Sequence, residues 1–180
     1  MPGKIVSYAL KNAIDLIEEA EILYSTKKYA RANLLGLLAV EEISKADLIL
    51  HYHRGEINVN LKKDLENHPV KFGSKDKVYL MRRQRVALVT KADRNAHKYE
   101  QSRQDSMYVG VRNSKIVRPS EIRAGKAEST IKKAKENLYY QYLKHVHTTD
   151  PKYDVRLPKP PDYIKIAKGY EKVLNIKRKN

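Results

Sequence analysis

Polar and ionisable side chains that could perform acid–base or phosphate chemistry recur at three places in this chain of 180 residues. The set comprises Glu41, Glu42, Lys45, His68, Lys71, Arg103 and Tyr108. An imidazole that titrates near neutrality can take the proton from a ribose 2′-hydroxyl, and a cation can stabilise the charge that develops on a phosphate during attack. These residue types fit metal-independent cleavage of RNA, but a solvated surface histidine is the simpler interpretation of each imidazole.

A second candidate group lies further along the chain, where Arg94 and His97 stand about one helical turn apart. We expect nucleic acid to contact this group and the basic residues before it; the predicted contact set is Lys71, Arg82, Arg85, Arg94 and His97. The charge distribution supports this. Residues 1–60 carry a net charge of −1 and residues 61–180 carry a net charge of +17, which together give the total of +16. Such an excess attracts polyanions, although a lysine-rich soluble surface would have the same composition.

The element that must position the two glutamates is an apolar helix. Leucines and valine at 34, 35, 37, 38 and 40 point to every side of a helix, so this segment must be surrounded by protein. Glu41 and Glu42 follow directly and diverge by about 100°, which places at least one acid near the core. Lys45 lies within reach of either acid. The trio is therefore either a structural salt bridge or a functional polar centre.

Familiar catalytic signatures are missing from the chain. There is no phosphate-binding glycine loop, dinucleotide fingerprint or serine nucleophile elbow. His51 and His53, like His145 and His147, are spaced i,i+2, which points the two rings to different sides of a helix. We therefore expect no metal site and no cofactor.

Composition favours one intracellular globular domain. The chain has no cysteine, which excludes disulfides, thiolate metal sites and a cysteine nucleophile. No window is long and apolar enough for a membrane span, and the N-terminus lacks a secretory pattern. We expect a soluble cytoplasmic protein that does not enter a membrane.

Hydrophobic periodicity predicts a succession of helices. Their expected ranges are 8–24, 28–53, 74–107, 120–147 and 162–176, with irregular chain at 54–75 and an extended loop or irregular hairpin around 108–118. Gly36 lies inside the second helix at a cost of about 1 kcal/mol relative to alanine, which a close helix crossing would explain. The predicted fold class is all-α, an up-and-down bundle of four to five helices with an appended C-terminal helix.

The expected division of the chain has three parts. Residues 1–147 form the helical domain, residues 148–161 a proline-rich linker, and residues 162–180 a C-terminal amphipathic helix with a basic tail.

The order of several segments resembles the AbiV abortive-infection family of the HEPN superfamily. The segments are Asn12-Ala13, Ala20, Tyr29-Ala30-Arg31-Ala32, Glu41-Glu42-Ile43-Ser44-Lys45, His68 with Lys71, Met107-Tyr108-Val109-Gly110 and Arg118-Pro119-Ser120. The likeness covers roughly residues 8–145. Its most specific parts are the Glu-Glu-x-x-Lys helix end and the Tyr-Val-x motif before a proline-led helix.

The resemblance implies a small helical bundle, often dimeric, of a kind that includes many endoribonuclease toxins of phage defence. The usual catalytic signature of the superfamily is an arginine followed four to six residues later by histidine. No arginine precedes any of the six histidines at that spacing here. Gly110 also stands where relatives usually have aspartate, which removes an acid.

Two hypotheses follow from the resemblance. In the first, the protein is a homodimeric, metal-independent endoribonuclease effector of antiviral defence. His68 acts as base or acid, and Arg103 and Lys45 stabilise the phosphate charge. Glu41 or Glu42 orients these three side chains, and Tyr108 belongs to the same site. In the second, it is a non-catalytic module that binds RNA or a protein partner, such as an antitoxin or a phage protein, and the same polar set is an internal network.

Overall fold

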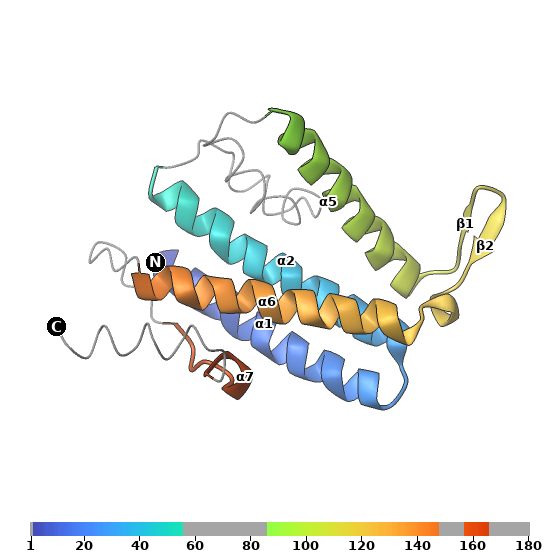
Figure 1. Cartoon of the computed structure of the whole chain (residues 1–180), viewed down its shortest axis with the longest axis horizontal. Helices are drawn as coiled ribbons and strands as arrows, with labels where there is room; N and C mark the ends of the chain where they lie inside the picture. Colours follow the sequence, from blue (N-terminus) through green and yellow to red (C-terminus); the bar gives the residue numbers. More distant parts are fainter. Residues whose placement is uncertain (1, 56–85, 148–156, 166–180) are drawn as a thin grey trace.

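The structure is a computed structural model that describes residues 2–55, 86–147 and 157–165. Within these residues it is almost entirely helical, which confirms the predicted all-α class (Figure 1). The elements are α1 (Pro2–Ser25), α2 (Tyr29–His53), α5 (Val86–Met107), β1 (Gly110–Arg112), β2 (Lys115–Val117), the 3₁₀ turn η1 (Pro119–Glu121), α6 (Ala124–His147) and α7 (Asp162–Lys165).

Helices α1 and α2 form an antiparallel hairpin, as an up-and-down bundle requires. Their connection is short, and Lys27 turns the chain with a φ of 61°. Helix α1 begins at Pro2 and not near Tyr8, because its apolar stripe extends back to Val6, which is fully buried. Proline is well suited to the first turn of a helix, where its missing N–H has no intrahelical partner.

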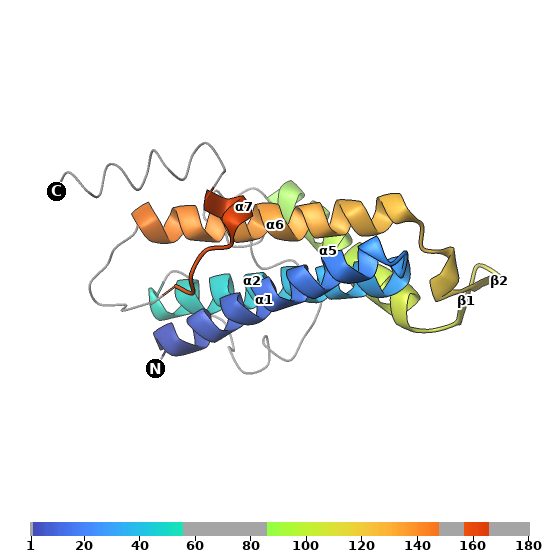
Figure 2. The same cartoon turned by 90° about the horizontal axis from the view of Figure 1, so that it is seen from below.

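The main core lies among α1, α2 and α6, which run side by side in both views (Figures 1 and 2). Its largest fully buried apolar side chains are Leu10, Ile17, Leu37, Ile43, Ile49, Leu138, Tyr142 and Ile164. Helix α5 packs against α2 at an angle to the other three helices (Figure 1). The bundle therefore rests on α2, which contacts each of the other long helices that the structure describes.

Gly36 marks a close crossing of α2 and α6, as the sequence predicts. A Cβ atom at this position would lie 3.0 Å from Thr130 Cγ2 and 3.4 Å from the backbone nitrogen of Ile131. The absence of a side chain lets α6 approach α2 closely.

A two-stranded antiparallel hairpin connects α5 to α6 and projects beyond the end of the bundle (Figures 1 and 2). Its turn residues Asn113 and Ser114 have φ values of 46° and 61°, the left-handed geometry of tight hairpin turns. The next helix begins at Ala124 and not at Ser120, because η1 ends on Ile122 in an extended conformation before α6 starts.

The described C-terminal segment packs onto the bundle. Ile164 of α7 is fully buried within the main core, and Tyr142 donates a hydrogen bond to the Pro158 carbonyl at 2.8 Å. Burial, together with the nearby charges of Glu21 and Glu18, raises the pKa of Tyr163. The predicted helix over 162–176 is described only as far as Lys165; its remaining residues lie outside the described part.

Candidate functional site

The acidic end of the apolar stretch in α2 is a buried and paired arrangement. Glu41 is buried, and Lys45 forms an ion pair with Glu42, both side chains being partly buried. The expected ion pair is confirmed, and it uses the i,i+3 spacing. Lys45 therefore already has a carboxylate partner inside its own helix.

Arg103 of α5 is paired in the same way. Its Nε and Nη2 donate to the two oxygens of Glu100 at 2.9 and 2.7 Å, and Gln104 also donates to Glu100 at 2.8 Å. The hydrogen bond to Glu100 raises the pKa of Arg103, and the charges of Glu100, Glu41 and Tyr108 act in the same direction against the effect of burial. Arg103 is thus a permanently charged group held by a bidentate pair.

Three residues of the predicted polar set interact electrostatically, since Glu41 and Tyr108 both help to raise the pKa of Arg103. Glu41 comes from α2, Arg103 from α5, and Tyr108 follows the end of α5 with 60% of its surface exposed. Arg103 is the cation of this group, and Glu100 on its own helix already pairs with it.

A second polar network, centred on Asn33 of α2, joins three helices. Asn33 is fully buried, and its amide nitrogen donates to Ser102 Oγ at 3.2 Å and to Ser106 Oγ at 2.7 Å, both on α5. Its carbonyl oxygen accepts a hydrogen bond from Thr130 Oγ1 of α6 at 2.7 Å. Both ends of the amide are satisfied, so this network fixes α5 and α6 against α2.

The predictions from sequence do not include Asn33. A single amide directly before an apolar helical stretch is a detectable signal, because a buried amide requires partners. Its partners Ser102 and Thr130 lie 69 and 97 residues away, and no local spacing reveals them.

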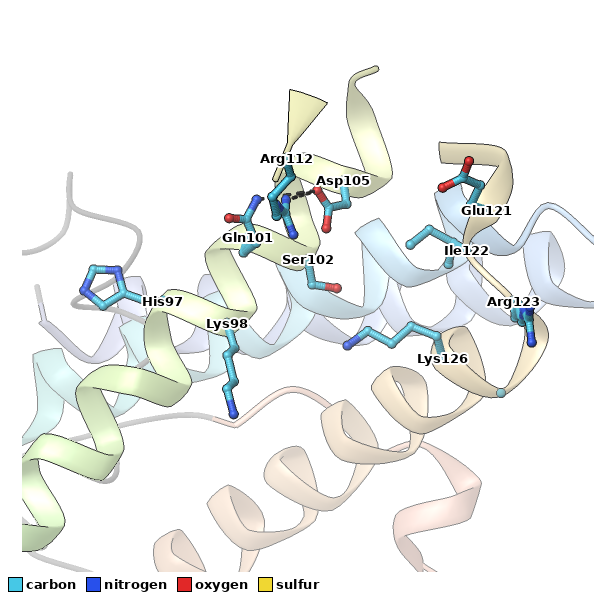
Figure 3. A pocket seen from close by; sticks show the side chains of 11 residues that line it. His97, Lys98, Gln101, Ser102, Asp105, Arg112, Glu121, Ile122, Arg123 and Lys126 are labelled. Atoms are coloured by element: carbon cyan, nitrogen blue, oxygen red, sulfur yellow. Dashed lines mark hydrogen bonds and ion pairs between the residues drawn. The ribbon is translucent and has the colours of Figure 1, made fainter. Parts of the chain in front are cut away.

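A pocket with a volume of about 910 Å³ opens between α5 and the start of α6 (Figure 3). We call it the α5–α6 pocket. Residues of α5, β1, η1, the η1–α6 connection and the first turn of α6 line it: His97, Lys98, Gln101, Ser102, Asp105, Arg112, Glu121, Ile122, Arg123, Gly125 and Lys126. The α5 residues share one face because they are spaced at i, i+1, i+4, i+5 and i+8.

The α5–α6 pocket is basic. Four cationic residues and two carboxylates line it, which gives a net charge of +2 with His97 neutral. Arg112 is paired with Asp105, whereas Lys98, Arg123 and Lys126 form no ion pair with any residue that the structure describes. Figure 3 shows the Lys126 side chain reaching from α6 toward α5, with His97 at the edge of the pocket.

Arg103 and the α5–α6 pocket lie on different flanks of α5. Ser102 lies at the border of the pocket face, and Ser106, which also bonds Asn33, lies between it and Arg103 around the helix. The structure therefore brings His97 together with a set of cations, but it does not place Arg103 among them.

Neither a metal centre nor a membrane span is evident in the described residues. No three side chains among their histidines, aspartates and glutamates are close enough together to hold a metal ion. None of the described helices is long and apolar enough to cross a bilayer.

Comparison with protein families matches residues 4–139 to the AbiV family, HEPN_AbiV. The match spans α1, α2, α5, the hairpin and most of α6. The chain belongs to the AbiV family. This confirms the resemblance inferred from the Glu-Glu-x-x-Lys helix end and the Tyr-Val-x motif, and it identifies an abortive-infection module of the HEPN type. No curated protein and no solved structure matches the chain.

Every residue that lines the α5–α6 pocket lies within the AbiV match, and the segment 157–165 lies beyond it. Four of the catalytic and nucleic-acid-binding residues predicted from sequence lie outside the described residues: His68, Lys71, Arg82 and Arg85. Arg94 belongs to α5 by its backbone, and its side chain is not described. His97 is the predicted nucleic-acid contact that lines the α5–α6 pocket.

Proposed function

We propose that this AbiV protein acts in abortive infection by binding RNA, with the phosphate backbone held in the α5–α6 pocket. The observation that supports this most is the pairing state of the cations. Lys45 and Arg103 are matched by glutamates within their own helices, whereas Lys98, Arg123 and Lys126 face one pocket without an ion-pair partner among the described residues.

Phosphate contacts supply most of the affinity of proteins for nucleic acid, and lysine and arginine provide them. The volume of the pocket, about 910 Å³, lies near the upper end of the range of ligand sites, about 300–1,000 Å³. It therefore has room for a nucleotide unit with its phosphate. The net charge of +17 on residues 61–180 attracts the rest of the strand.

The proposal is tested by the affinity of the purified protein for a fluorescein-labelled single-stranded RNA. Lys126→Glu should weaken binding at least tenfold, because it replaces an attraction by a repulsion at the phosphate. Lys132→Glu is the matched control: Lys132 is exposed on α6, six residues further on, and does not line the pocket. Equal affinities of the two variants would contradict the proposal.

Metal-independent RNA cleavage is the second candidate, favoured by the imidazole of His97 at the edge of a basic pocket. In this reaction the 2′-oxygen attacks phosphorus and the bond from phosphorus to the 5′-oxygen breaks. His97 takes the 2′-hydroxyl proton, the leaving 5′-oxygen receives a proton from water, and Lys98 and Lys126 offset the charge on the phosphate oxygens. The products are a 2′,3′-cyclic phosphate and a 5′-hydroxyl.

Cleavage is measured with end-labelled RNA in the presence of EDTA. If His97 is the base, His97→Ala should lower the rate by about 10²–10⁴ while RNA affinity changes little. His53→Ala, at the end of α2, is the control. Loss of activity in His68→Ala alone would assign the base to the residue predicted from sequence, and no cleavage by the wild type would leave RNA binding as the function.

A further inference from the structure

Two carboxylates line the α5–α6 pocket, and they differ in their pairing with the described residues. Asp105 forms an ion pair with Arg112 of β1. Glu121, the last residue of η1, is exposed, and its carboxylate forms no ion pair with any residue that the structure describes. Within the described residues the pocket therefore presents an unpaired carboxylate beside its unpaired cations.

An unpaired carboxylate is unfavourable next to a phosphate, because the two negative charges repel each other. It adds affinity where the ligand offers hydrogen-bond donors, since an ionised carboxylate only accepts. Its two oxygens are matched best by two parallel donors, as in the pairing of arginine with carboxylates. Glu121 is thus suited to a part of the RNA that presents two neighbouring N–H groups.

Among the four RNA bases, guanine alone has two neighbouring donors on its Watson–Crick edge, N1–H and the 2-amino group. Adenine and cytosine each present one amino group next to a ring nitrogen that accepts. Uracil presents one N–H between two carbonyl oxygens, which repel a carboxylate. These edges are free only in unpaired bases, and single-stranded RNA is the form in which proteins read them.

The surroundings of Glu121 fit a base, and the opposite part of the pocket fits a phosphate. Ile122 lines the pocket next to Glu121 and is half-buried, so it offers an apolar surface to the face of a base. In Figure 3 Glu121 and Ile122 lie on the η1 side of the pocket, whereas the ends of the Lys98 and Lys126 side chains lie nearer α5. The acidic and the cationic parts are therefore separate, as are the base and the phosphate of one nucleotide.

We propose that the α5–α6 pocket selects guanosine nucleotides of single-stranded RNA, and that Glu121 accepts hydrogen bonds from N1–H and the 2-amino group of the base. Ile122 packs against the face of the base, and Lys98 and Lys126 hold the phosphate. This rests on the proposed RNA site and adds the base that the site reads. Glu121 determines the specificity, because phosphate contacts carry no sequence information.

Fluorescence anisotropy of the full chain, freed of nucleic acid, tests the base preference. The probes are labelled single-stranded oligoadenylates that differ only in the central base, which is guanine, hypoxanthine or adenine. The wild type should bind the guanine probe about tenfold more tightly than the adenine probe, the discrimination expected of a good bidentate pair. Hypoxanthine keeps N1–H and lacks the 2-amino group, so its probe should fall between the other two.

Glu121→Gln should abolish the guanine preference, because an amide offers one acceptor and one donor where guanine needs two acceptors. The same variant should bind the adenine probe more tightly than the wild type does, since a repulsion of the phosphates is removed. Glu128→Gln is the matched control: it removes the same charge from an exposed position of α6 outside the pocket and should keep the preference. Circular dichroism of each variant checks folding.

Equal affinity of the wild type for the three probes, or a guanine preference that survives Glu121→Gln, would overturn the proposal. Lys126→Glu separates this result from a failure of the RNA site itself. If it weakens the binding of every probe and the wild type shows no preference, the pocket binds phosphate and reads no base. If Lys126→Glu and Lys132→Glu bind every probe equally well, or the wild type binds none, both proposals fail.

Discussion

Arg103 lies on α5 and Lys126 lies on α6, and the two cations differ in whether a carboxylate pairs with them. Arg103 donates two hydrogen bonds to Glu100, and the charge of Glu41 adds to the effect that keeps its pKa high. Lys126 is exposed in the α5–α6 pocket and has no carboxylate partner among the described residues. A cation already neutralised by a bidentate partner contributes less to phosphate binding than a free one.

Asn33 provides the residue-scale prediction. Asn33→Ala would leave buried hydroxyl groups of Ser106 and Thr130 without their amide partner, and should lower the free energy of unfolding by about 1–3 kcal/mol. Asn12→Ala, at an exposed position of α1, should change it by less than about 0.5 kcal/mol. Urea unfolding followed by circular dichroism gives both values, and equal stability of the two variants would contradict the role of Asn33.

At the scale of elements, helical periodicity and short connections predict the α1–α2 hairpin and the position of α6 to within a few residues. The start of α6 is predicted four residues early, because a proline followed by an acid is a good helix start and the extended conformation of Ile122 has no local signal. The flank of α5 that carries Arg103 is likewise set by contacts of Ser102 and Ser106 with α2, which are distant in sequence.

The crossing at Gly36 provides the prediction for elements. Gly36→Val should lower the free energy of unfolding by about 1–3 kcal/mol, because the added side chain meets Thr130 and the backbone of Ile131 on α6. Gly125→Ala is the control: nothing lies within 4 Å of a Cβ there, and better helix propensity should raise stability by up to about 1 kcal/mol. A thermal or urea melt that ranks Gly36→Val at or above the wild type would contradict the close crossing.

At the scale of the molecule, composition predicts a basic second part and a polyanionic partner, and the segment order predicts the AbiV family. The α5–α6 pocket itself could not be predicted, because its walls come from residues 97–112 and 121–126 and meet only through the fold. His97 lines the pocket and Arg103 pairs with Glu100 on another flank of α5, a difference that only the fold reveals.

The salt dependence of RNA binding tests the central claim most directly, because the slope of log K against log salt reports the number of phosphates neutralised. For single-stranded RNA, Arg123→Ala/Lys126→Ala should reduce the magnitude of the slope by about 1.4, or about 0.7 for each lost contact. The control Lys11→Ala/Lys132→Ala removes the same charge from exposed positions outside the pocket and should leave the slope unchanged. The same slope for both double variants would contradict an RNA phosphate site in the α5–α6 pocket.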